Sequence, residues 1–241
     1  MKIKALFLKK VYGIANKINE DIYIYQDDDK IVFQSIQSGL AVLLELIYKT
    51  ECKKSDNPIV FELRKIKNII SILNDDDNIE LIKKDEYVLF KTKSFSRKVR
   101  LIVPDKPRFT FPDERKDKPL IFTHEIDIFN SSLKNAINAS SDISNHISFK
   151  LYKDKLDLIR EDKTDEFKYE LKDEKIKIVK FTDTIENMYS DEYINNFCTS
   201  VDGKLKIKLI KDGPIKFENK PIKDLTIKYT IAPMVKVDDE L

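Results

Sequence analysis

The chain has 241 residues, 44 Lys and Arg against 42 Asp and Glu, and only 4 Gly, 2 Cys and 2 His. Two cysteines cannot build a disulfide framework, and together with the histidines they lack the spacing of a zinc site. The glycines are scattered singly, which excludes a glycine-rich phosphate loop, and no apolar run reaches the ~18 residues that span a bilayer. We therefore expect a reduced, intracellular protein without a metal or nucleotide cofactor.

Hydrophobic periodicity predicts four β-hairpins, each preceded by an amphipathic helix. The helical segments are 6–18, 63–73, 127–139 and 191–199, and the hairpins are 21–36, 79–91, 147–160 and 204–218. The helix–hairpin order recurs at intervals of roughly 60 residues, which indicates a fourfold pseudo-repeat. The alternative is an α+β protein whose elements recur without true repetition.

A proline-rich stretch separates the second repeat from the third. Pro104, Pro107, Pro112 and Pro119 are half of the chain's 8 prolines. Such a composition is typical of an extended linker. It predicts an N-terminal domain over 1–103, a connecting loop over 104–119 and a C-terminal domain over 120–241. Two aromatic residues of this loop, Phe109 and Phe111, either stay exposed for a partner or pack on the local sheet.

Charge is unevenly distributed over the four helical segments. The first two carry three basic residues each and no acidic one, the third is balanced, and the fourth carries Asp191 and Glu192 alone. The basic residues are Lys9, Lys10, Lys17, Arg64, Lys65, Lys67 and, in the third segment, Lys134. A helix face with several lysines and no acid suits a phosphate backbone contacted without base reading, although a merely solvated face is commoner.

Acidic clusters at 27–29, 75–77 and 238–240 raise the alternative of a metal-dependent nuclease. The first two fall in predicted turns, where Asp is favoured for local reasons, and the third lies at the end of the chain. Neither His124 nor His146 has a nucleophile at motif spacing. We therefore predict no catalytic residue and no metal ligand.

Several motifs resemble the proliferating cell nuclear antigen (PCNA) family, the archaeal and eukaryotic DNA polymerase sliding clamps. Residues 193–197 (Tyr-Ile-Asn-Asn-Phe) are similar to the family's Y-L-x-x-F helix, and 214–218 with 227–233 resemble the final hairpin that ends in Y-L-A-P. Residues 8–11 and 33–36 resemble the first helix and second strand, and 101–118 the interdomain connector. The resemblance spans the whole chain, with two departures: the acidic fourth helix, and Thr230 where the family has an aromatic residue.

The resemblance implies an α+β DNA-clamp fold of two similar domains, each with two helix–hairpin repeats and helices on one face of antiparallel sheets. It implies a trimeric ring around duplex DNA that acts as a polymerase processivity factor in replication and repair, without enzyme activity. The implied partners are a DNA polymerase, a flap endonuclease, a DNA ligase and a clamp loader. The implied location is the cytoplasm or nucleoid of an archaeon, or the nucleus of a eukaryote. The DNA-binding residues would be the seven basic residues named above.

The family's other sites also map onto this sequence. The positions that match its partner-peptide pocket are Ile36, Leu40, Phe109, Phe111, Pro214, Ala232 and Pro233. Family subunits join edge strand to edge strand, here 95–102 and 167–172, with Arg97, Lys98, Arg100, Phe167, Tyr169 and Leu171 at the interface. The basic first edge and the acids near the second (Asp162, Asp165, Glu166 and Glu170) favour head-to-tail pairing.

Three alternatives stay open at this stage. One is a specialised clamp relative for damage signalling or viral transcription, and another is a protein-only scaffold. The third concerns assembly: the acidic fourth helix leaves a ring of non-identical subunits as an alternative to a homotrimer.

Overall fold

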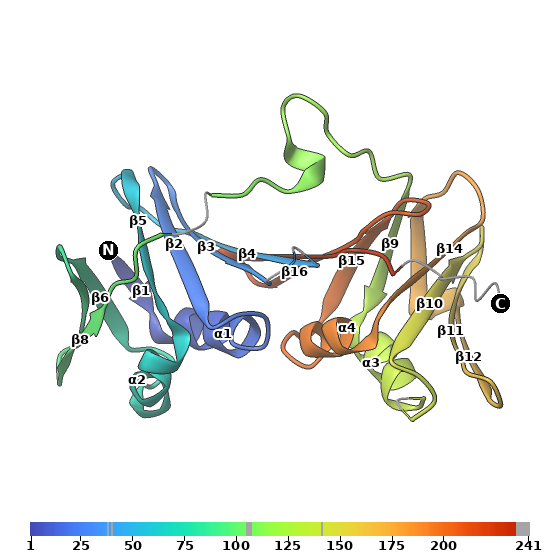
Figure 1. Cartoon of the computed structure of the whole chain (residues 1–241), viewed down its shortest axis with the longest axis horizontal. Coiled ribbons are helices and arrows are strands. Elements are labelled where there is room, and N and C mark those ends of the chain that lie inside the picture. The colour runs from blue at the N-terminus through green and yellow to red at the C-terminus, as the bar shows by residue number, and fades with distance from the viewer. Residues whose placement is uncertain (38, 40, 105–107, 141, 235–241) are drawn as a thin grey trace. The chain divides into compact units, whose positions relative to one another are not determined.

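The computed structural model describes residues 1–37, 39, 41–104, 108–140 and 142–234 (Figure 1). The chain divides into two compact units. Unit 1 comprises Met1–Gly39, Leu43–Phe109 and Ile222–Ile227, and unit 2 comprises Leu40–Val42, Thr110–Pro221 and Lys228–Leu241. Along the proline-rich connector the boundary falls between Phe109 and Thr110. No helix among the described residues is long and apolar enough to cross a membrane.

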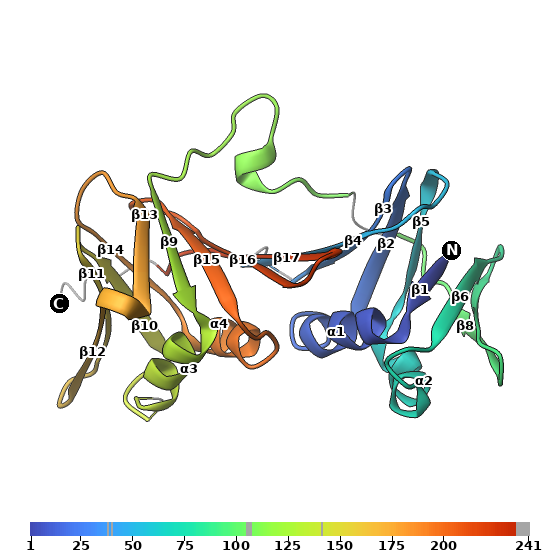
Figure 2. The ribbon, with the colours of Figure 1, turned by 180° about the vertical axis from the view of Figure 1, so that it is seen from behind.

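Unit 1 contains two four-stranded antiparallel arrays and two neighbouring helices. One array has the order β1-β6-β7-β8 and the other β4-β3-β2-β5. Its strands are β1 (Lys2–Lys4), β2 (Asp21–Asp27), β3 (Lys30–Ile36), β4 (Val42–Lys49), β5 (Ser55–Glu62), β6 (Asn78–Lys83), β7 (Tyr87–Lys91) and β8 (Ser96–Arg100). Helix α1 (Ala5–Ala15) lies beside α2 (Lys67–Ile72), which continues a 3-10 turn, η1 (Leu63–Ile66) (Figure 2).

Unit 2 repeats this plan. Its strands run in the orders β12-β11-β10-β14 and β13-β9-β15-β16-β17. They are β9 (His124–Phe129), β10 (His146–Leu151), β11 (Lys155–Glu161), β12 (Glu166–Lys172), β13 (Ile176–Lys180), β14 (Ile185–Ser190), β15 (Lys204–Leu209), β16 (Ile215–Ile222) and β17 (Leu225–Ile231). The segment Ile222–Ile227, where the last two strands meet, belongs to unit 1. Helices α3 (Asn130–Asn138) and α4 (Asp191–Cys198) lie next to each other, and short 3-10 turns occur at η2 (Pro112–Glu114) and η3 (Asp173–Lys175).

Aromatic contacts between helix and strand organise both cores. In unit 1 the Phe7 ring of α1 stacks on Tyr48 at 4.5 Å and meets Phe33 edge-on at 5.0 Å. In unit 2 the Phe197 ring of α4 stacks on Tyr229 with centroids 4.8 Å apart. Burying one such side chain contributes about 1.5–3 kcal/mol, so each contact is a large part of what holds its helix on the strands.

A buried arginine joins the two helices of unit 2. Arg160 is 1% exposed; its guanidinium donates to the carbonyl oxygens of Ser144 (2.7 Å) and of Ile137 (3.2 Å) near the end of α3. It also pairs with the carboxylate of Asp191, the first residue of α4. A cation at a helix C-terminus and an anion at a helix N-terminus both complement the helix dipoles. The pair therefore fixes α3 against α4 and neutralises one of the two acids of α4.

The four predicted hairpins and the α+β clamp fold are confirmed. The predicted third helix begins too early, because Asp127–Phe129 belong to β9 and only residues from Asn130 onward are helical. Ile126 and Ile128 are buried while Asp127 faces outward, which is the alternation of a strand. Strands β1, β4, β5, β9, β13 and β14 were not predicted.

Removing the buried arginine tests its structural role. Arg160→Ala leaves Asp191 without its partner, and breaking a buried ion pair from one side costs about 3–5 kcal/mol. We expect the urea midpoint of unfolding to fall clearly, measured by circular dichroism. Arg115→Ala, which removes an exposed connector arginine, is the matched control and should leave the midpoint unchanged. Equal midpoints for the two variants would contradict the role assigned to Arg160.

Candidate nucleic-acid and partner-binding site

The basic residues of unit 1 lie on or beside the helices, away from the apolar faces that pack against the core. Helix α1 buries Leu8, Val11 and Ile14, and Lys9 and Lys10 lie between these positions, partly exposed. Lys17 follows the end of α1 and is exposed, as are Lys65 and Lys67 beside the buried Ile66. Because core packing takes the apolar face, the lysine side chains lie outside the core.

Two of these basic residues already have acidic partners. The Lys9 ammonium lies 2.7 Å from the Asp75 carboxylate, and Arg64 pairs with Glu62. Both acids lie outside the helices, so a count of charge along each helix does not include them. Exposed pairs of this kind contribute little to stability, but they reduce the positive charge that the helices present.

The acidic character of α4 is weaker than its sequence indicates. Asp191 is occupied by Arg160, which leaves Glu192 as the exposed acid of the helix. On the neighbouring α3, Lys134 is partly exposed. Helix α4 therefore does not present the two negative charges that the sequence predicted for it.

Arg108 and Phe109 fix the connector to β2 and β3 of unit 1. The Arg108 guanidinium donates to both carboxylate oxygens of Asp27, at 3.0 and 2.9 Å, and lies 4.9 Å from the Tyr25 ring centroid. The next residue, Phe109, is held through its main chain: its N–H donates to the Gln34 side-chain oxygen (3.3 Å), and its carbonyl accepts from the Gln34 amide (3.0 Å). Phe109 itself is partly buried.

The second half of the connector is fixed to β16 and β17 of unit 2. Phe111 is 0% exposed, with the Lys216 and Lys228 ammonium groups 4.8 and 5.7 Å from its ring centroid. Lys216 lies 2.8 Å from both carboxylate oxygens of Asp113, and Lys228 lies 2.7 Å from Glu114. Of the two alternatives for the connector phenylalanines, exposure is therefore wrong for Phe111: the lysine side chains cover its ring, so it packs on the local sheet.

Electrostatics keep this second anchor ionised. Burial raises the pKa of Glu114, but the hydrogen bond from Lys228 and the charges of Lys228 and Lys216 outweigh it, and the pKa falls below its usual value. Glu218 on β16 follows the same balance. Burial raises its pKa, but the hydrogen bond from Lys208, 2.8 Å away, and the charges of Lys208, Lys216 and Lys228 together lower the pKa below its usual value.

The other predicted pocket residues are placed as follows. Ile36 ends β3 and is 5% exposed, Pro214 is partly buried before β16, and Leu40 lies outside the described residues. After β17, Ala232 is exposed and its N–H donates to the Ala41 carbonyl at 2.8 Å.

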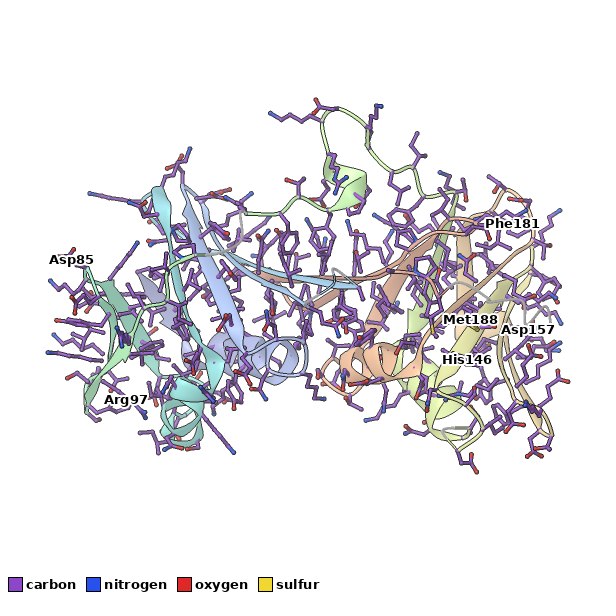
Figure 3. The ribbon with its side chains drawn as sticks, in the orientation of Figure 1. Asp85, Arg97, His146, Asp157, Phe181 and Met188 are labelled. Carbon is purple, nitrogen blue, oxygen red and sulfur yellow. The ribbon has the colours of Figure 1, made fainter. Side chains whose placement is uncertain are left out.

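A cavity of about 490 Å³ in unit 2 includes one of the predicted pocket residues, Pro233. Its wall also contains Ser148 of β10, Asn187 and Met188 of β14, and Met234; Met188 is labelled in Figure 3. The Met234 N–H donates to the Met188 carbonyl at 2.8 Å, so the chain after β17 runs along β14. The sequence offered no signal for this cavity, because its walls come from segments that are distant along the chain.

The two predicted interface strands, β8 and β12, are both edge strands of their sheets. Arg97, Lys98 and Arg100 are exposed on β8, with the Lys98 ammonium 4.9 Å from the Tyr87 ring centroid; Arg97 is labelled in Figure 3. On β12 the Phe167 and Tyr169 rings stack with centroids 6.4 Å apart and are partly buried. Leu171 differs: it is 0% exposed and belongs to the core, so we remove it from the interface set.

The acids near β12 are largely used within the chain. Glu170 lies 2.6 Å from Lys155 and 3.0 Å from Lys172, and these hydrogen bonds lower its pKa to about 2. Asp162 accepts the backbone N–H groups of Thr164 and Asp165, which lower its pKa and close the turn. The charge complementarity expected between the two edges is therefore smaller than the sequence indicates.

Members of the first two acidic clusters have partners within unit 1. Asp27 binds Arg108, Asp75 binds Lys9, and the Asp77 carboxylate accepts the Asn74 N–H at 2.8 Å. The cluster at 238–240 lies outside the described residues. Among the residues that the structure describes, no three His, Cys, Asp or Glu side chains gather as a metal site would require.

The Arg108–Asp27 pair generates a pH prediction. The hydrogen bond from Arg108 lowers the pKa of Asp27. The contribution of this ion pair to stability is therefore complete above the ordinary aspartate pKa of about 3.9. It is lost as the pH falls through the lower pKa of Asp27 in the folded state. Arg108→Gln should bring the Asp27 pKa back up toward its usual value in a carboxyl NMR titration. Arg115→Gln, in the same connector, should not change it; an unchanged Asp27 titration in the Arg108 variant would refute the pairing.

Comparison with known proteins gives a consistent result. No protein-family model matches the sequence. The DNA polymerase sliding clamp of Thermoplasma volcanium is 20% identical over 225 residues, which cover 90% of this chain and 89% of that protein. PCNA from Thermococcus kodakaraensis superimposes with a TM-score of 0.82 at 19% identity, covering 96% of this chain and 98% of that one.

Two further solved structures agree. Proliferating cellular nuclear antigen from Entamoeba histolytica gives a TM-score of 0.82 at 18% identity, over 97% of this chain and 98% of that one. A. fulgidus PCNA bound to the C-terminal region of FEN-1 gives 0.81 at 18% identity, over 98% of each chain. The chain thus has the DNA-clamp fold, and it resembles the PCNA family, as a divergent relative, over nearly its whole length.

Proposed function

We propose that the chain is a DNA sliding clamp, a polymerase processivity factor that encircles duplex DNA as a trimeric ring and recruits replication and repair enzymes. The observation that carries this proposal is the likeness, over nearly the whole chain, to a DNA polymerase sliding clamp and to PCNA structures. On this proposal the protein holds enzymes on DNA inside the cell and recruits them there, and it catalyses no reaction itself.

The lysine-bearing helices supply the DNA contact in this proposal. A clamp that slides must touch phosphates without reading bases, and long lysine side chains on a helix surface do this. The candidates are Lys9, Lys10, Lys17, Arg64, Lys65, Lys67 and Lys134. Of these, Lys9 and Arg64 would have to exchange a carboxylate partner for a phosphate. Linkage of a closed ring to DNA replaces tight binding, so a net charge of +2 is compatible with the function.

The ring itself would form through strand pairing between subunits. Edge strands expose unpaired main-chain groups, and pairing β8 of one subunit with β12 of the next would satisfy them and close a head-to-tail ring. Arg97, Lys98, Arg100, Phe167 and Tyr169 are the proposed contact residues. The domain limits 1–103 and 120–241, joined by the connector 104–119, remain part of the proposal.

Partner enzymes would bind through a peptide that docks by apolar anchors and main-chain pairing. One of the similar structures is PCNA bound to the C-terminal region of FEN-1, which supports a flap endonuclease as a partner. A DNA polymerase, a DNA ligase and a clamp loader are the other proposed partners. Ile36, Leu40, Phe109, Pro214, Ala232 and Pro233 are the proposed pocket residues; Phe111 would have to leave its buried position to take part.

The decisive experiment compares circular with linear DNA. With the polymerase and loader of the same organism, the protein should increase the product length on a primed circular template. It should lose this effect when the template is linearised with free ends, because a closed ring slides off. Equal stimulation of both templates would overturn the ring proposal and favour a scaffold that binds the polymerase alone.

The DNA-facing lysines give a charge-reversal prediction. Lys10→Glu, Lys17→Glu and Lys67→Glu together should lower stimulation on circular DNA at least tenfold, because each reversal replaces attraction to a phosphate with repulsion. The dependence of DNA affinity on salt should also weaken, by about one unit of slope for each phosphate that is no longer neutralised.

The matched control makes the same change of charge elsewhere. Lys211, Lys220 and Lys223 are exposed near the ends of β15, β16 and β17. Reversing these three lysines should leave stimulation within about twofold of the unchanged protein. If both triple variants lose activity equally, the effect is one of net charge, and the assignment of α1 and α2 as the DNA surface fails.

The edge strands give a prediction about assembly. Arg97→Glu with Arg100→Glu should shift the sedimentation profile toward the monomer, because both residues lie on the exposed edge of β8. The control is Arg115→Glu with Lys116→Glu, two exposed connector residues, which should leave the profile unchanged. An assembly unaffected by the β8 changes would place the subunit contact elsewhere.

A further inference from the structure

The second anchor of the connector has the organisation of a receptor with a ligand in place. Lys216 on β16 is only 1% exposed, and lysine is rarely buried without acidic partners. The partners that complete its environment come from the connector: Asp113 through both oxygens at 2.8 Å, and Glu114 at 3.3 Å. We call Lys216 and Lys228 the lysine pair, and Phe111–Glu114 the connector turn.

The sheet alone does not supply these charges. Within the described residues the carboxylate of the sheet itself that pairs with Lys216 is Glu218, at 3.7 Å, and it is closer to Lys208, at 2.8 Å. Without the connector turn, the buried ammonium group of Lys216 would face one distant and already engaged carboxylate. Lys216 therefore takes its close acidic partners from outside the sheet.

The connector turn presents three groups from one tight turn. The Glu114 N–H donates to the Phe111 carbonyl at 2.9 Å, and this 3-10 turn directs the ring and both carboxylates toward the lysine pair. The pattern is an aromatic residue followed, two and three positions later, by acidic ones. Any peptide with this spacing carries the same chemistry: a ring for the lysine side chains to cover and two carboxylates for their ammonium groups.

The attachment is confined to a short segment. After the connector turn, the residues from Arg115 to Pro119 are all exposed, and the next main-chain anchor is the Leu120 N–H, which donates to the Pro112 carbonyl at 2.8 Å. Release of the turn would therefore expose Phe111 and break the turn's bonds with the lysine pair and with Leu120.

We propose that the connector turn is an internal ligand of the lysine pair, and that it competes there with partner peptides that carry an aromatic residue followed by two acidic ones. The connector thereby limits access to the sheet until a partner displaces it. The proposal rests on the clamp function only in identifying the partners as clamp-bound enzymes; the competition itself involves neither DNA nor ring assembly.

The test measures binding of a labelled peptide to the full chain. The probe is a fluorescein-labelled peptide with the sequence of residues 108–115, Arg-Phe-Thr-Phe-Pro-Asp-Glu-Arg, followed by fluorescence anisotropy. Phe111→Ala with Asp113→Asn and Glu114→Gln opens the site in the protein. We expect the opened variant to bind the probe at least tenfold more tightly than the unchanged chain. A probe with Asn and Gln in place of its two acids should lose this gain.

A second variant shows whether the lysine pair is the receptor. Adding Lys228→Met to the opened variant should reduce probe affinity at least tenfold, because Lys228 is the pair's more accessible member. Asp117→Asn, an exposed connector acid, is the matched control and should bind the probe as the unchanged chain does. Thermal unfolding followed by circular dichroism confirms that each variant is folded.

Two results would overturn the proposal. One is equal affinity for the probe in the unchanged and opened chains. The other is an affinity of the opened variant for the probe that changes neither with Lys228→Met nor with removal of the probe's two acids. Failure of the clamp function would be recognised separately, in the comparison of circular and linear templates. The two proposals can therefore fail independently.

Discussion

The packing of each helix on aromatic strand residues is the contact on which the rest of the structure depends. Phe7 on Tyr48 and Phe197 on Tyr229 bury one side of α1 and of α4. Once that side is committed to the core, the polar side chains of the helix are left facing outward. The arrangement of lysines that we assign to DNA is thus a by-product of core packing, repeated because the helix–hairpin unit is repeated.

The near-neutral net charge does not show that many acidic residues are paired with basic residues inside the chain. Those that pair inside the chain, such as Asp191 with Arg160 and Asp113 with Lys216, fix elements that are far apart in sequence. Glu170 and Asp162 are occupied in the same way around β12. Because these carboxylates are already paired, the charge that the protein presents near α4 and β12 is less acidic than a count along the chain indicates. Near α1 and α2 it is less basic, because Asp75 and Glu62 pair with Lys9 and Arg64.

Local pattern predicted local structure well. The hairpins at 21–36 and 147–160 follow from alternation and a polar turn, which act between neighbours in sequence. The third helix was extended into β9 because the apolar spacing around Ile126 and Phe129 fits a helix until strand pairing with β13 and β15 is known. The same limit applies to the site. Lysines 10, 17, 65 and 67 were identified by composition, but the burial of Phe111 depends on Lys216 and Lys228, more than a hundred residues away, and no pattern near the connector encodes them.

The Gln34–Phe109 contact has a consequence for how this connector can vary. The Gln34 amide accepts from the N–H of residue 109 and donates to its carbonyl, so one side chain imitates the donor and acceptor pair of a neighbouring strand. Gln34 is itself held in place, 1% exposed and bonded to Glu45 at 2.8 Å. Since only backbone atoms of residue 109 take part, the register of the chain there is set independently of the side chain it carries. The side chain at position 109 can consequently change without altering the two hydrogen bonds that hold the backbone there to Gln34.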